Sequence, residues 1–159
     1  MNARSGCVTL GVAMDDAPIL ICYDDSKAAR RGIGAAAALF SQRRAVVLDV
    51  APPVTVGESY ATLGAITPKS VGMNADEALS RARIGAGLAL DAGLAAEARA
   101  GVDAATWDGV VGIADEIDAA VIVIGSRGLT GLRELFEGSL SHDVAEHAGR
   151  PVLIVPPPR

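Results

Sequence analysis

Short apolar runs rich in β-branched residues alternate along this chain with segments typical of helices. The apolar runs predict strands over residues 18–23, 45–50, 94–100, 119–124 and 151–155. The segments between them predict helices over residues 27–42, 74–91 and 139–148, and one more that begins at Thr106. Residues 52–73 predict the longest irregular stretch, because two prolines follow the second strand and no clear period precedes residue 74.

Regular alternation of strand and helix, repeated five times, predicts parallel strands joined by right-handed crossovers. The expected fold is therefore an α/β, doubly wound, five-stranded parallel sheet with helices on both faces. Such sheets bind ligands beyond the carboxyl ends of their strands, where the strand order reverses. With a strand order of 3-2-1-4-5, the reversal lies between the first and fourth strands. Asp24 ends the first strand and Gly125 ends the fourth, so both are expected to flank one crevice.

Length and charge limit the domain organisation and the partners of this chain. Its 159 residues fit one domain, predicted over residues 17–159, because residues 1–16 do not join the pattern and are expected to form a loosely held tail. A net charge of −5 argues against a nucleic acid or a membrane surface as partner. Cys7 and Cys22 lack the spacing of a zinc site, and no segment is typical of a signal peptide or a membrane span. The cytoplasm is the expected location.

A glycine-rich segment after the fourth strand has the composition of an anion site. Gly125 and Gly128 allow backbone N–H groups to converge on a ligand, and Gly138 and Ser139 precede a predicted helix whose first N–H groups lack partners. Two such donor groups, separated by nine residues, suit a chain of phosphates. No P-loop lysine follows a G-x-x-x-x-G pattern, and Arg127 is the nearest fixed cation in the segment. Ordinary turns at a strand end and a helix start are the alternative interpretation of these glycines.

The pattern G-x2-G-x9-G-[ST], formed by Gly125, Gly128, Gly138 and Ser139, resembles the nucleotide-binding signature of the universal stress protein family, in its ATP-binding branch. The resemblance runs from about residue 18 to residue 155. Its first half depends on residues 24–26, Asp-Asp-Ser, which are similar to the Asp-Gly-Ser of the family. The second aspartate stands where the family usually has glycine and adds a negative charge near the expected nucleotide.

The resemblance implies a site for ATP, with Mg²⁺, and assigns a role to each matching residue. Asp24 would contact the ribose side, and Val50 and Ile124 would pack near the adenine. The phosphate side would be formed by Gly125, Arg127, Gly128, Gly138, Ser139, Leu140 and Ser141. The residues themselves leave other interpretations open, because Asp24 also suits a capping turn, and Val50 and Ile124 also suit a plain core.

The resemblance further implies a homodimer that forms through the fifth strand, Val152 to Val155. An apolar edge strand with unpaired backbone groups favours such pairing. The expected function is that of a nucleotide-dependent sensor or regulator of the stress response, with no catalysis beyond slow ATP hydrolysis or autophosphorylation. A dimeric interaction module of the same fold that does not bind nucleotide is the alternative.

Three further patterns predict structure rather than chemistry. Gly32 and Gly34 fit a loose dinucleotide fingerprint, but they lie within a predicted helix, which disfavours an NAD-dependent enzyme. His142 and His147 have no metal-ligand spacing and are expected to be solvated or capping residues of the last helix. Trp107 is expected to be a packing residue at the start of its helix, because single-strand binders need several aromatic side chains.

Overall fold

The sheet of this protein has five parallel strands, as the sequence predicts. A computed structural model describes residues 16–51, 68–103, 105–126 and 140–158. The strands are β1 (Ile19–Cys22), β2 (Arg44–Ala51), β3 (Ala95–Val102), β4 (Val121–Gly125) and β5 (Val152–Val155). They lie in the order β3-β2-β1-β4-β5. β1 and β4 are therefore adjacent, and the strand order reverses between them. The predicted fold and strand order are confirmed.

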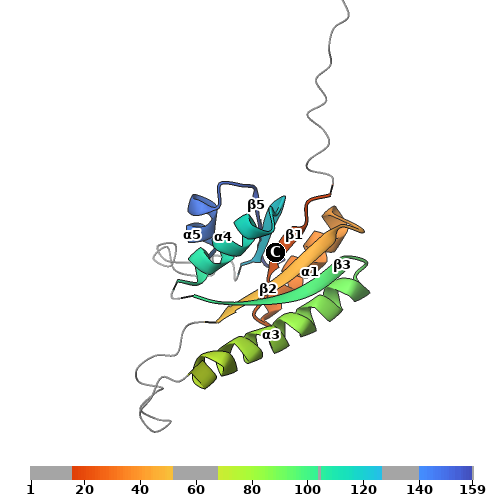
Figure 1. Cartoon of the computed structure of the whole chain (residues 1–159). Helices are drawn as coiled ribbons and strands as arrows, with labels where there is room; N and C mark the ends of the chain where they lie inside the picture. Colours follow the sequence, from red (N-terminus) through yellow and green to blue (C-terminus); the bar gives the residue numbers. More distant parts are fainter. Residues whose placement is uncertain (1–15, 52–67, 104, 127–139, 159) are drawn as a thin grey trace, which may run out of the picture.

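Helices cover both faces of the sheet (Figure 1). The described helices are α1 (Lys27–Leu39), α3 (Pro68–Asp91), α4 (Thr106–Glu116) and α5 (Leu140–His147). One core layer packs α1 and α3 against one face of the sheet, and a second layer packs α4 and α5 against the other. Two layers of helix explain why the central strands consist of continuous apolar runs, since neither of their faces meets water.

The central strand β1 lies fully inside the protein. Ile21 pairs with Val47 of β2 on one side and with Val123 of β4 on the other, and all three are buried. Side chains alternate between the two faces, so Ile21 contributes to the α1 and α3 layer while Leu20 contributes to the α4 and α5 layer. Because these strands are parallel, the carboxyl ends of β1, β2 and β4 lie at the same edge of the sheet.

Two predicted helix boundaries are wrong. The helix predicted to begin at residue 74 begins at Pro68, so residues 68–73 of the predicted irregular stretch are helical. Proline suits the first turn of a helix, where its missing N–H is not needed, and this feature outweighs the Gly and Asn that follow. The first helix was predicted to run to Gln42 but ends at Leu39, because Gln42 takes a left-handed backbone conformation with φ 64°. Residues 52–67 lie outside the described part of the chain.

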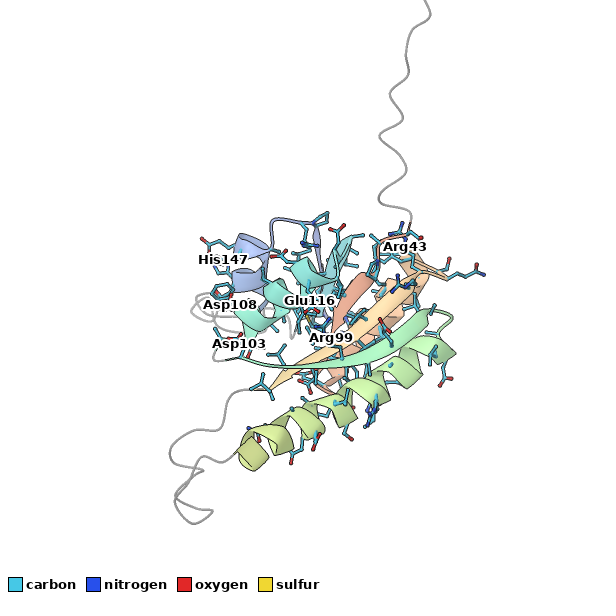
Figure 2. The ribbon with its side chains drawn as sticks, viewed as in Figure 1. Arg43, Arg99, Asp103, Asp108, Glu116 and His147 are labelled. Carbon is cyan, nitrogen blue, oxygen red and sulfur yellow. The ribbon has the colours of Figure 1, made fainter. Side chains whose placement is uncertain are left out.

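Arginine side chains connect β3, β4 and β5 to helix α4. Arg150 donates to the carbonyl oxygen of Ala119 at 2.5 Å and to Asp115 Oδ1 at 2.5 Å, and so ties the start of β5 to α4 and β4. Arg99 of β3 forms an ion pair with Glu116 at the end of α4 (Figure 2).

Among the described helices, none has the length and apolar character that crossing a bilayer requires.

Candidate functional site

A cleft of about 150 Å³ opens at the carboxyl edge of the sheet, at the reversal between β1 and β4. Asp24, from the end of β1, and Gly125, from the end of β4, both line it. Apolar side chains form much of the rest of its wall, namely Cys22, Leu48, Val50, Val110, Ile124 and Leu140. The cleft is smaller than the roughly 300–1,000 Å³ of sites that enclose a whole drug-sized ligand, so the described walls suit part of such a ligand.

The β1–α1 turn places Asp24 at the mouth of this cleft. Asp24 Oδ1 accepts a hydrogen bond from the N–H of Ser26 at 3.0 Å, and Ser26 Oγ accepts one from the N–H of Ala29 at 3.1 Å. Ser26 is thus the N-cap of α1. The carboxylate of Asp24 is exposed to solvent and therefore combines a turn-forming role with access to the cleft.

Asp25 occupies a backbone conformation that favours glycine, with φ 62°. This explains physically why a glycine suits the position. The side chain of Asp25 compensates through two contacts, since its Oδ1 accepts from Tyr23 Oη at 2.8 Å and from Arg30 Nη2 at 2.6 Å. The hydroxyl of Tyr23 and then the guanidinium of Arg30 hold the pKa of Asp25 below its ordinary value. The negative charge that the sequence adds here is thus partnered by Arg30.

Gly125 allows close contact between the end of β4 and the first turn of α1. A Cβ on Gly125 would overlap the carbonyl group of Ala28 and would lie 2.9 Å from the backbone nitrogen of Ala29. Gly32 faces the same point, since a Cβ there would lie 3.4 Å from the backbone nitrogen of Gly125. The missing side chain at Gly125 therefore makes room for a helix backbone, whereas the sequence suggested that it makes room for a ligand.

A buried carboxylate, Asp49, lines the cleft from the end of β2 and was not among the predicted site residues. Arg81 of α3 donates through Nε to Asp49 Oδ2 at 2.5 Å. Burial raises the pKa of Asp49 in spite of this pair, and the charge of Asp24 adds to the increase. An aspartate inside an apolar strand run was the sequence signal that could have identified it, because charged residues are seldom buried without a partner.

Cys22 forms part of the cleft floor. Burial raises the pKa of its thiol to about 12, with further contributions from Asp24 and Asp49. The thiol therefore stays protonated at neutral pH and does not act as a nucleophile there.

The predicted site residues fall into three groups. Five of them line the one cleft, namely Asp24, Val50, Ile124, Gly125 and Leu140. Ser141 lies in the first turn of α5 and is not among the lining residues. Arg127, Gly128, Gly138 and Ser139 lie outside the described residues. Sequence reasoning missed Asp49, Tyr23 and Thr106, which the fold brings to the cleft from three different elements.

The remaining residues that the sequence singled out do not line the cleft. Gly32 and Gly34 lie inside α1, as predicted. The ring of Trp107 stacks on that of His147, with centroids 4.4 Å apart, and His147 Nδ1 lies 2.8 Å from the carbonyl oxygen of Asp143 (Figure 2 shows His147 at the end of α5). Within the part of the chain that the structure describes, no group of three histidine, cysteine or acidic side chains could hold a metal ion.

Comparison with known proteins identifies the family of this chain. Residues 17–156 match the model of the universal stress protein family. The chain belongs to the universal stress protein family. Universal stress protein YxiE of Bacillus subtilis (strain 168) is 50% identical over 42 residues, which are 26% of this chain and 28% of that protein. The match thus spans less than a third of this relative.

Two solved structures of universal stress proteins have the same fold and contain a nucleotide. One is in complex with cAMP; it is 25% identical, with a TM-score of 0.63, and the match covers 87% of this chain and 96% of that one. The other, from Archaeoglobus fulgidus, is in complex with dAMP; it is also 25% identical, with a TM-score of 0.59, and the match covers 87% of this chain and 97% of that one. Both ligands are adenine nucleotides.

Proposed function

We propose that this universal stress protein binds ATP, with Mg²⁺, and acts as a nucleotide-dependent sensor or regulator. The observation that carries the proposal is the meeting of Asp24 and Gly125 in one cleft, at the reversal of strand order where α/β sheets bind ligands. The two relatives in complex with cAMP and dAMP support an adenine nucleotide as the ligand.

The walls of the cleft suit the two ends of a nucleotide differently. Val50, Ile124 and Leu140 offer apolar surface to a base, and the carboxylate of Asp24 can accept hydrogen bonds from ribose hydroxyls. A carboxylate repels phosphates, so the triphosphate is expected at the β4 side, where the glycine-rich segment begins at Gly125. Mg²⁺ would be held mainly by the phosphates and water, which is its usual mode with nucleotides.

Binding rather than turnover is the proposed role. Rapid phosphoryl transfer needs a positioned nucleophile and cations on the transferred group. Within the described cleft, the carboxylates are Asp24, which forms the β1–α1 turn, and Asp49, which pairs with Arg81, while the Cys22 thiol stays protonated. Hydrolysis of ATP is therefore expected to be slow.

Isothermal titration with MgATP tests the proposal. The wild-type protein is expected to give a saturable isotherm, and Asp24→Asn is expected to weaken binding about tenfold, because it removes a charged acceptor. The asparagine oxygen can still accept from the Ser26 N–H, so the turn should persist and the circular dichroism spectrum should not change.

A wild-type protein that binds no MgATP would overturn the proposal and would leave the dimeric interaction module as the function. Mass spectrometry of small molecules released from freshly purified, heat-denatured protein gives an independent answer. Adenine nucleotide in that extract supports the proposal, and its absence, even after soaking in MgATP, supports the module.

The outer edge of β5 is the proposed interface of a homodimer. β5 is the last strand of the described sheet, so its outer backbone groups pair with no described strand, and the exposed Ile154 (41%) adds apolar surface beside them. Ile154→Lys is expected to change the mass from two chains to one in size-exclusion chromatography with light scattering. Ile84→Lys is a matched control, because Ile84 is 49% exposed but lies on α3, away from this edge. An unchanged mass for Ile154→Lys would argue against this interface.

A further inference from the structure

Arg31, in the second turn of α1, reaches the end of β4. Its Nη2 donates to the carbonyl oxygen of Ser126 at 2.7 Å, and its Nη1 donates to the carbonyl oxygen of Lys27 at 3.3 Å. Ser126 directly follows Gly125, whose backbone packs against the first turn of the same helix. The fork of the guanidinium therefore fixes the backbone where the chain leaves β4.

The positive charge of Arg31 is not neutralised by these contacts. Both acceptors are uncharged carbonyl groups, and its Nε is buried without a hydrogen-bond partner among the described residues. Two other arginines differ in this respect, because Arg30 pairs with Asp25 and Arg81 pairs with Asp49. Of the ion pairs formed between described residues, none includes Arg31.

This charge lies next to the end of β4, whereas the carboxylates of the cleft come from the ends of β1 and β2. Asp24 and Asp49 place carboxylates at the β1 and β2 side. Arg31 is not among the lining residues, but its Nη2 contacts the carbonyl oxygen of Ser126, which directly follows the lining residue Gly125. A ligand that donates hydrogen bonds at one end and carries negative charge at the other matches this arrangement.

We infer that Arg31 is a positioning and specificity-determining residue, which favours phosphorylated nucleosides over unphosphorylated ones. It does so by holding the exit of β4 in place and by supplying beside it a positive charge that forms no ion pair with a described residue. The inference rests on the proposed function, because it concerns the ligand of the same cleft, and it adds the reason why that ligand is an anion.

The test compares ATP with adenosine as competitors of a fluorescent adenine nucleotide. Arg31→Met is expected to weaken ATP about tenfold and to leave adenosine within about twofold of wild type, because adenosine carries no charge for Arg31 to attract. Arg83→Met, on the exposed face of α3, is the matched control, since it changes the net charge equally and should alter neither affinity. A purely structural role for Arg31 would weaken both ligands alike.

If Arg31→Met lost affinity for ATP and adenosine equally, or lost no affinity for ATP, the inference would be overturned. If Arg31→Met does not fold, Arg31→Gln serves in its place, since it keeps an uncharged hydrogen-bond donor at this position; the same selective loss of ATP affinity is expected. The two proposals fail separately. A wild-type protein that binds neither ligand refutes the proposed function and the inference with it, whereas wild-type binding with an unchanged ratio in the variants refutes the inference alone.

Discussion

Replacement of Gly125 by alanine is expected to lower the free energy of unfolding by about 3 kcal/mol and the melting temperature by about 10 °C. The added Cβ would overlap the carbonyl group of Ala28, which belongs to the backbone of α1 and cannot rotate away as a side chain would. Either α1 or the end of β4 must shift, and Arg31 would lose its contact with Ser126 if they separate. Thermal unfolding followed by circular dichroism measures the effect.

Gly34→Ala is the matched control for this experiment. Gly34 lies in the same helix, but a Cβ there would meet nothing within 4 Å. Alanine is the better helix former, so this variant should be more stable by about 0.5–1 kcal/mol. A melting temperature of Gly125→Ala within experimental error of wild type would show that α1 does not pack as described. Because Gly125→Ala disturbs the fold, a loss of nucleotide binding in it would not identify a ligand contact.

Replacement of Arg81 by methionine is expected to cost about 2 kcal/mol at neutral pH. Asp49 is 6% exposed and would keep its charge without its partner, whereas methionine preserves much of the apolar volume of the arginine stem. The estimate is below the usual cost of breaking a buried pair, because the side chain of Arg81 is itself 38% exposed. Urea unfolding at a series of pH values measures both the size and the pH dependence of the loss.

The stability that Arg81→Met loses relative to wild type should become smaller as the pH falls. Burial already raises the pKa of Asp49 above its ordinary value of about 4, and removal of Arg81 takes away the contact that opposes this increase. Between the unfolded and folded pKa values the folded state binds more protons, so its stability rises as the pH decreases through that range. The double variant Arg81→Met with Asp49→Asn has no charge to bury and should regain most of the lost stability. A deficit of Arg81→Met that is constant between pH 5 and pH 8 would contradict this account.

The Gly125 contact and the Asp49–Arg81 pair lie at the same edge of the sheet, on opposite sides of the cleft. Gly125 sets the distance between β4 and α1, and the pair of Asp49 with Arg81 sets that between β2 and α3. Both contacts position cleft walls, so the geometry of the candidate site depends on how α1 and α3 are fastened to the sheet.

The sequence by itself determined the fold and the place of the cleft. Apolar runs such as Ile19–Cys22 and Val121–Gly125 are typical of strands buried on both faces, and their alternation with helices permits few topologies. The position of Asp24 and Gly125 at the ends of β1 and β4 then follows from counting residues. Resemblance to the universal stress protein family suggested a ligand for this cleft, which remains a proposal, and the family itself is confirmed.

The tertiary structure alone decided which side chains meet across the cleft. Arg31 and Ser126 are 95 residues apart, and Asp49 and Arg81 are 32 apart, so no local pattern relates either pair. The role of Gly125 likewise depends on α1, because a glycine at a strand end looks the same in sequence whether it faces a ligand or another backbone. Local hydrophobic periodicity fixes elements and topology, whereas contacts between elements depend on the packing of all the layers at once, and only the folded chain specifies that packing.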